Sequence, residues 1–101
     1  MSSIRIPIDQ TAGNALCDKW KVRELSLFGS VLRDDFDEDS DVDVLVSFET
    51  DAPWSLWDLI VMRDELSAMF GRPVDLVERE AIENPFRRHR ILTTREIIHA
   101  A

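Results

Sequence analysis

LSLFGSVLRDDFDEDSDVDVLVSF, residues 25–48 of this 101-residue chain, decides the fold. The stretch predicts a strand, a tight turn at Gly29, a short helix, an acidic loop and a second strand. Glycine at the turn lets the backbone approach a ligand closely, and a helix that begins at Ser30 presents free N–H groups to phosphate. We therefore expect the turn to bind an anionic group, with Ser30 as a plain helix N-cap as the structural alternative.

Acidic side chains crowd the loop and the start of the second strand. Seven of the ten residues from 34 to 43 are Asp or Glu. For residues 34–39 a solvated acidic loop is the better interpretation. Asp41 and Asp43 differ, because they stand side by side on one face of a strand that continues into the apolar run Val44–Val46. Mg²⁺ takes oxygen ligands from one or two carboxylates and from substrate phosphates, so this pair predicts a magnesium site.

The pair Gly29-Ser30, followed by ten intervening residues and Asp41-Val42-Asp43, resembles the signature of the DNA polymerase β-like nucleotidyltransferase superfamily. Ser40 and the apolar residues on either side of the motif strengthen the resemblance. The whole chain resembles the minimal nucleotidyltransferase (MNT) domain, the antitoxin half of HEPN–MNT toxin–antitoxin pairs. This resemblance implies an α/β (α+β) nucleotidyltransferase fold. It also implies a single domain over residues 1–101, whose small mixed β-sheet has its helices packed on one face.

The resemblance further implies which residues form the site. Asp75 lies within the apolar stretch 74–77, where an acid is costly to bury without a partner. It resembles the third catalytic carboxylate of the superfamily, and an edge-strand aspartate that faces water is the alternative. In many relatives a glycine stands where this chain has Asp34. The catalytic and metal-binding acids are then Asp41, Asp43 and Asp75. The nucleotide-binding residues are Gly29, Ser30, Arg33 and Ser40.

The activity that the resemblance implies is transfer of AMP from ATP to a tyrosine of a cognate HEPN RNase toxin, with two Mg²⁺ ions as cofactors. That toxin is the expected partner, and the transfer silences it. The chain contains no tyrosine, so the modified tyrosine must belong to another protein. One alternative is an inactive nucleotide-binding antitoxin that neutralises its toxin by occlusion. The other is a small-molecule nucleotidyltransferase that a partner subunit completes.

The composition narrows the possible functions. A net charge of −8 argues against non-specific nucleic-acid binding, which depends on Lys and Arg. The single cysteine, Cys17, cannot form an internal disulfide and is expected to be a small buried hydrophobe, which favours a reducing cytoplasm. No early apolar run suits a signal peptide, and no run of about 18 apolar residues suits a membrane span. We therefore expect a cytoplasmic protein that does not contact the membrane.

The segments on either side of the motif are predicted to supply helices. Residues 4–8 suggest a short extended arm, and residues 9–22 a helix whose apolar positions are Ala12, Leu16 and Trp20. A second helix begins at Ser55, which forms a capping box with Asp58, and ends at Gly71. Its predicted buried stripe consists of Leu59, Met62, Leu66 and Met69.

Three expectations concern the remaining residues. From Asn84-Pro85 onward the chain is predicted to be helical, with buried contacts at Ile91, Ile97 and Ile98. Residues 87–90 form a basic cluster that can contact solvent, an acidic patch of a partner, or a triphosphate, and solvent is the simplest of these. Trp54 and Trp57 are expected to pack in the core or at its rim, with base stacking or partner docking as the alternative.

Overall fold

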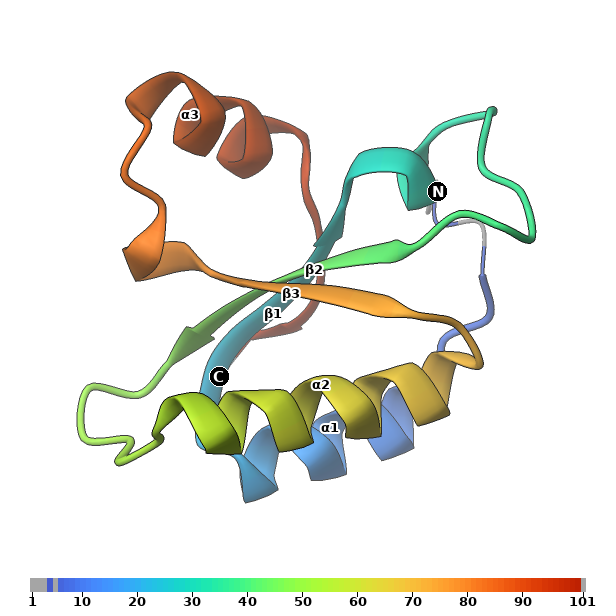
Figure 1. Cartoon of the computed structure of the whole chain (residues 1–101). Coiled ribbons are helices and arrows are strands. Elements are labelled where there is room, and N and C mark those ends of the chain that lie inside the picture. Colours follow the sequence, from blue (N-terminus) through green and yellow to red (C-terminus); the bar gives the residue numbers. More distant parts are fainter. Residues whose placement is uncertain (1–3, 5, 101) are drawn as a thin grey trace.

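The computed structural model describes residue 4 and residues 6–100 (Figure 1). Its helices are α1 (Gln10–Lys19), α2 (Leu56–Phe70) and α3 (Pro85–Thr94), with the short 3₁₀ turns η1 (Gly29–Leu32) and η2 (Arg79–Ala81). Its strands are β1 (Val22–Phe28), β2 (Val42–Phe48), β3 (Val74–Glu78) and β4 (Glu96–Ala100). The predicted order of strand, turn, acidic loop and strand is therefore present between residues 22 and 48.

The four strands form one mixed sheet in the order β3-β2-β1-β4. β1 runs antiparallel to both β2 and β4, and β2 runs parallel to β3. Helices α1 and α2 lie together on one side of the sheet, while α3 lies on the other side (Figure 1). The α/β fold class is confirmed. The expected single helical face holds for α1 and α2, whereas α3 packs Ile91 against Phe28 and Leu45 on the opposite face.

Both helices on the first face begin where the sequence predicts, and α2 also ends where it predicts. Asp9 caps α1 by accepting a hydrogen bond from the backbone N–H of Ala12, at 3.0 Å. Ser55 and Asp58 form the predicted capping box of α2, and Gly71 ends α2 in the left-handed conformation. Of the expected stripe of α2, the fully buried side chains are Met62 and Leu66.

The core between sheet and helices depends on strand alternation. Val42, Val44 and Val46 of β2 are fully buried in the same cluster as the stripe of α2. The intervening residues of β2 point to the opposite face, because successive side chains of a strand alternate. Cys17 is fully buried in this core, and burial raises the pKa of its thiol to about 12. The expectation that Cys17 is a packing residue is confirmed.

The end of the chain differs from the prediction. Residues 96–100 form strand β4 instead of continuing the helix, which ends at Thr94. β-branched residues such as Ile97 and Ile98 favour extended backbone, and β1 offers them a free edge to pair with. As a result Ile97 is 48% exposed, contrary to the expectation of burial, whereas Ile98 packs at the edge of the core.

The amino-terminal part of the chain shows smaller differences. α1 ends at Lys19, and β1 begins at Val22, so the predicted helix 9–22 is too long at its end. The residues after α1 form a turn in which Lys21 adopts a φ of 53°. Ile6 is buried in the core without belonging to a strand, and Arg5 lies outside the described residues. The segment is thus an arm, which is one of the two forms expected for it.

The two tryptophans near the start of α2 have different environments. Trp54 packs edge-to-face on Trp20, with ring centroids 4.9 Å apart, and its indole N–H donates to the Trp20 carbonyl at 2.6 Å. Trp57 is 78% exposed, so the expectation that it packs in the core or at its rim is wrong.

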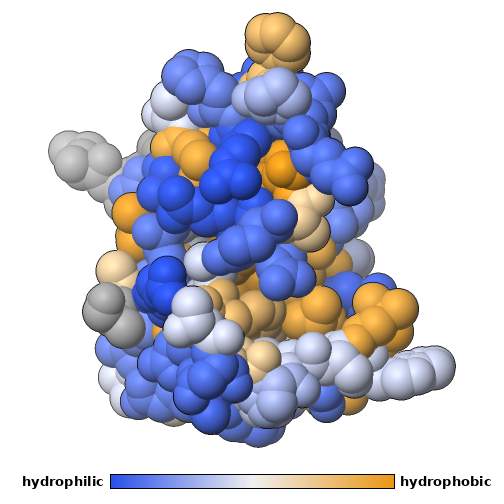
Figure 2. Space-filling view, turned by 90° about the vertical axis from the view of Figure 1, so that its left-hand side faces the viewer, coloured by the Kyte–Doolittle hydropathy of each residue, from blue (hydrophilic) through white to orange (hydrophobic). Residues whose placement is uncertain are grey.

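Figure 2 shows that hydrophobic residues interrupt a surface that is otherwise mainly hydrophilic. Within residues 4 and 6–100, no helix is both long and apolar enough to span a membrane.

Candidate functional site

The turn at Gly29 contacts the carboxylate of Asp43 directly. Phe28, the last residue of β1, is the register partner of Asp43 in β2, so the turn that follows Phe28 begins next to this acid. Gly29 has a φ of +75°, which favours glycine, and a Cβ at this position would lie 2.3 Å from Oδ2 of Asp43. Any side chain at position 29 would therefore displace the carboxylate. This explains physically why glycine precedes Ser30.

The second predicted acid of the site lies next to Asp43. Asp75 of β3 is the register partner of Asp43 in the parallel pair, so both side chains project from the face opposite α1 and α2. Asp75 is exposed on an edge strand, as the alternative interpretation required, and it also neighbours Asp43, as a shared site requires. Asp41 is exposed and precedes the first residue of β2.

The electrostatics of Asp43 reflect this crowding. Burial raises the pKa of the Asp43 carboxyl above its ordinary value, and the negative charges of Asp75 and Asp41 raise it further. The positive charges of Arg33 and Arg87 oppose the increase. Asp43 is thus a half-buried acid within electrostatic reach of two other acids and two arginines.

These acids have the donor chemistry of a magnesium site. Carboxylate oxygens are the ligands that Mg²⁺ prefers, and a divalent cation would relieve the repulsion that raises the pKa of Asp43. Among the residues that the structure describes, no three His, Cys, Asp or Glu side chains are already grouped as a metal site. The side chains that could hold such a cation are Asp43 and Asp75, with Asp41 as the adjoining acid.

The predicted nucleotide-binding residues lie in two places. Ser30 is in the first turn of η1, and its hydroxyl donates to the carbonyl of Asp41 at 3.4 Å, which links the glycine turn to the start of β2. Arg33 follows η1 and forms an exposed ion pair with Asp35, at 3.3 Å. Ser40 instead belongs to the acidic loop, where its hydroxyl donates to the carboxylate of Asp37 at 3.1 Å. Ser40 therefore shapes the loop rather than the glycine turn.

Arg72 fixes this acidic loop, a role that no pattern in the sequence indicates. Its guanidinium donates to the carbonyl of Asp37 at 2.6 Å and to the carbonyl of Ser40 at 3.2 Å. It also lies 4.4 Å from the ring centroid of Phe36. The contact joins residues up to 35 positions apart, so no local pattern could reveal it. Arg72 positions the loop that leads into Asp41.

A cleft opens between η1 and α3, next to the Gly29 turn. Its volume is about 680 Å³. The cationic side chains that line it come from both walls, Arg33 on one side and Arg87 and Arg90 on the other. The remaining lining residues are Phe28, Gly29, Leu32, Ile91 and Thr94. Part of the basic cluster at residues 87–90 thus lies beside the glycine turn.

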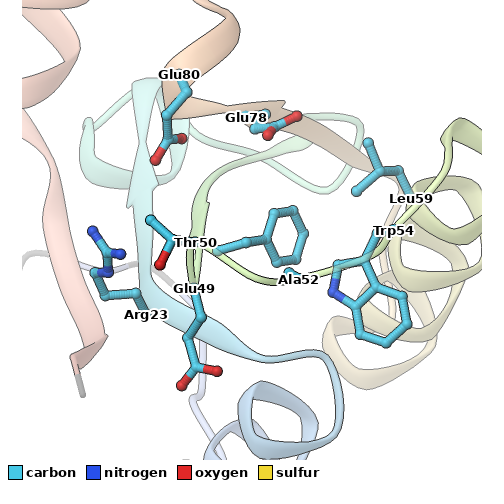
Figure 3. Close-up of a pocket in the computed structure, with 9 residues that line it drawn as sticks. Arg23, Glu49, Thr50, Ala52, Trp54, Leu59, Glu78 and Glu80 are labelled. Carbon is cyan, nitrogen blue, oxygen red and sulfur yellow. The ribbon is translucent and has the colours of Figure 1, made fainter.

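A second cavity, of about 420 Å³, lies toward the other end of β2. Figure 3 shows the carboxylates of Glu49, Glu78 and Glu80 around it, with Arg23 at one side and Trp54 at another. Glu80 is engaged by the hydroxyl of Ser47, which donates to it at 2.5 Å. None of the residues predicted to form the site lines this cavity.

Comparison with known proteins shows the family to which the chain belongs. The profile of the nucleotidyltransferase domain family matches residues 11–98. The protein adenylyltransferase MntA of Thermococcus cleftensis is 42% identical over 69 residues, which cover 68% of each of the two chains.

Two solved structures share the fold. A structure described as a minimal nucleotidyltransferase, an assignment that its authors made provisionally, matches with a TM-score of 0.71 and 31% identity, over 86% of each chain. A complex of a tri-AMPylated Shewanella oneidensis HEPN toxin with an MNT antitoxin matches with a TM-score of 0.66 and 17% identity, over 91% of this chain and 70% of that one. This chain belongs to the nucleotidyltransferase domain family, and within it to the minimal nucleotidyltransferases related to MntA.

Proposed function

We propose that this nucleotidyltransferase transfers AMP from ATP to a tyrosine hydroxyl of a cognate HEPN toxin, and that it acts as the antitoxin of that pair. The observation that carries the proposal is the contact between Gly29 and Asp43, with Asp75 in register beside them. Two relatives support the choice of acceptor. One is named a protein adenylyltransferase, and the other is an MNT antitoxin in complex with an AMPylated HEPN toxin.

Different residues of the site bind the triphosphate and hold the metal ion. The backbone N–H groups of η1 and the hydroxyl of Ser30 bind the triphosphate, as a helix start does. Asp43 and Asp75, with Asp41, would hold Mg²⁺. When bound, this ion neutralises phosphate charge and favours ionisation of the attacking hydroxyl.

The chemical step exchanges one phosphorus–oxygen bond for another. The tyrosine oxygen attacks the α-phosphorus, and the bond from this phosphorus to the oxygen that bridges to the β-phosphate breaks. Pyrophosphate leaves with that oxygen, and a carboxylate oxygen of Asp75 accepts the phenolic proton. Asp75 suits this role because it is exposed, so an incoming side chain can reach it, and because it lies beside Asp43. Positioning and charge neutralisation then supply most of the catalysis.

Intact-mass spectrometry of the partner tests the proposal. The purified chain is incubated with its cognate HEPN toxin, Mg²⁺ and ATP, and RNase activity is measured in parallel. We expect the toxin to gain the mass of one or more AMP groups and to lose RNase activity. Asp43→Asn should abolish the mass gain while the two proteins still form a complex.

The matched control is Asp39→Asn, which makes the same change of charge in the exposed acidic loop. This variant should transfer AMP at the native rate. If the toxin gains no mass and Asp43→Asn still neutralises it fully, the antitoxin acts by occlusion and the proposed transfer is wrong.

A further inference from the structure

We propose that Arg87 and Arg90 of α3 bind the β- and γ-phosphates of the nucleotide, so that α3 forms the wall of the site opposite the Gly29 turn. The two arginines are three positions apart on one helix, so their side chains share a face. Both line the cleft that Gly29 also lines. The inference rests on the proposed function, because it assigns further residues to the same nucleotide.

The placement of α3 makes this possible. α3 lies on the side of the sheet away from α1 and α2 (Figure 1), and it lines one cleft together with Gly29 and Leu32 of η1. Ile91, which lies between the two arginines and the end of α3, is buried against Phe28 and Leu45, which hold the helix against the strands that carry the site. The basic face of α3 is therefore held at a fixed position beside the glycine turn.

The partners of the arginines distinguish Arg87 and Arg90 from those with a structural role. Arg72 donates to loop carbonyls, and Arg95 forms an ion pair with Glu24 at 3.0 Å in a setting where both side chains are largely buried. For Arg87 and Arg90, by contrast, the described part of the chain provides no hydrogen bond or ion pair to the guanidinium. In a chain with a net charge of −8, two arginines that are both unpaired and directed at one cleft indicate an anionic ligand.

The charges around Asp43 place this ligand. Arg87 lines the cleft beside the Gly29 turn, and its positive charge is the smallest of the influences on the pKa of Asp43, which it lowers. Arg33 exerts the same effect from the other wall of the cleft. Phosphate oxygens that extend from the acids into the cleft would meet arginines on both sides. Guanidinium groups bind phosphate with two parallel hydrogen bonds, which suits a polyphosphate chain.

The size and lining of the cleft suit such a ligand. Its volume of about 680 Å³ lies within the usual range of about 300–1,000 Å³ for small-molecule sites. Phe28, Leu32 and Ile91 contribute apolar surface beside the arginines. Apolar walls lower the local dielectric constant, so each ion pair formed in the cleft is stronger than on an open surface.

Isothermal titration calorimetry on the full chain tests the inference with inorganic tripolyphosphate in metal-free buffer and with ATP, ADP and AMP in the presence of Mg²⁺. The variants are Arg87→Gln, Arg90→Gln and the double variant. Arg88→Gln is the matched control, because Arg88 belongs to the same helix but does not line the cleft. Thermal melts verify that every variant is folded.

We expect each cleft substitution to weaken tripolyphosphate and ATP binding by about 10-fold, the usual loss when a hydrogen bond to a charged group is removed. AMP affinity should change less than 2-fold, because AMP has neither of the phosphates assigned to these arginines. Arg88→Gln should match the native chain for every ligand. Equal tripolyphosphate affinity in the native chain and the double variant would overturn the inference, and so would an equal loss for AMP and ATP.

The calorimetry and the intact-mass assay of the toxin, run on the same variants, separate this inference from the proposed function. A chain that binds ATP through Arg87 and Arg90 but adds no mass to the toxin would refute the AMP transfer and leave the phosphate assignment intact. A chain that modifies its toxin at the native rate when both arginines are replaced would refute the phosphate assignment and leave the transfer intact.

Discussion

The two faces of the sheet use the same strands for different purposes. On the face toward α1 and α2, the residues of β2 are Val42, Val44 and Val46, all fully buried. On the opposite face, the alternate residues are Asp43, Leu45 and Ser47, which include a carboxylate and a hydroxyl. Alternation thus lets one strand contribute apolar burial on one side and reactive groups on the other. Substitutions that change stability and substitutions that change the chemistry should therefore fall on different faces of the sheet.

The strongest test of this separation is Leu66→Ala on the helical face. Leu66 is fully buried in the cluster of α1, α2 and the sheet, so the substitution leaves a cavity. We expect it to lower the free energy of unfolding by about 3 kcal/mol, as measured by urea denaturation. Nucleotide affinity per folded molecule should not change, because the site is on the other face.

Val61→Ala is the control for this substitution, since Val61 belongs to the same helix but is 50% exposed. Its effect should stay within about 0.5 kcal/mol. A Leu66→Ala chain that is fully folded yet has lost nucleotide binding would show that the two faces are coupled.

The alternation along β2 could be predicted from the sequence, because a period of two is a local pattern. The capping box at Ser55 and the glycine at position 71 are local in the same way, and both are present. The strand at residues 96–100 was not predicted, because the preference of two isoleucines for extended backbone is too weak to end a helix by itself. Their pairing with β1, more than 70 positions away, decides between the two.

The site shows the same limit. Spacing alone marked Gly29, Asp41 and Asp43, because these residues are close in the chain and in the fold. It could not show that Arg72 holds the acidic loop or that α3 lines the cleft, since both contacts depend on tertiary packing. Ser40 matches the motif, yet its hydroxyl donates to the carboxylate of Asp37 within the acidic loop.

Alanine substitutions at the three glycines test whether the site is rigid at Gly29. Gly29→Ala forces an alanine to adopt a φ of +75° and to displace the carboxylate of Asp43, so we expect a loss of about 2 kcal/mol or more together with weaker nucleotide binding. Gly71→Ala has a similar φ, +69°, but meets no atom within 4 Å, so it should cost only about 1 kcal/mol.

Gly13 completes the series, because its Cβ would meet nothing within 4 Å and it has no positive φ. Gly13→Ala should stabilise the chain by about 0.5 kcal/mol, since alanine favours a helix interior. Thermal melts of the three variants provide the ranking. A Gly29→Ala chain as stable as Gly71→Ala would mean that Asp43 moves away freely and that the site is not preorganised.

Magnesium should stabilise the folded chain by binding to the acids on the face of the sheet opposite α1 and α2. Because the acids around Asp43 repel one another, a cation that binds only the folded chain raises its stability by about 1.4 kcal/mol at ten times its dissociation constant. Melts with Mg²⁺ and ATP should therefore shift upward for the native chain. For the combined Asp41→Asn/Asp43→Asn variant the shift should nearly vanish, and an equal shift would locate the ion in the acidic loop instead.

A small, pH-dependent effect is expected at Glu65, at the border of the helical face. Its carboxylate accepts hydrogen bonds from Lys19, at 2.8 and 3.0 Å, and from Trp20, at 3.3 Å. The bond from Lys19 is the main reason that the pKa of Glu65 is lowered in the fold. A lowered pKa stabilises the fold fully above the unfolded value of 4.5, and this stabilisation is lost as the pH falls below it.

Glu65→Gln should therefore reduce stability at pH 7 by about 1 kcal/mol or less and make no difference at pH 2. Urea titrations between these pH values measure the change. A constant difference at every pH would mean that the contact contributes through packing rather than charge.

The pairing of β4 with β1 has a consequence for how the protein is made. β4 provides the outer neighbour of β1, and Arg95, just before it, forms the ion pair with Glu24 of β1. β1 is synthesised early and this partner late, so the sheet stays incomplete on the ribosome until Ala100 has emerged. Until then the edge of β1 is free to pair with other chains. A nascent chain that stalls before residue 96 should consequently be prone to aggregation and be a target for chaperones, even though every residue predicted to form the site has already been synthesised.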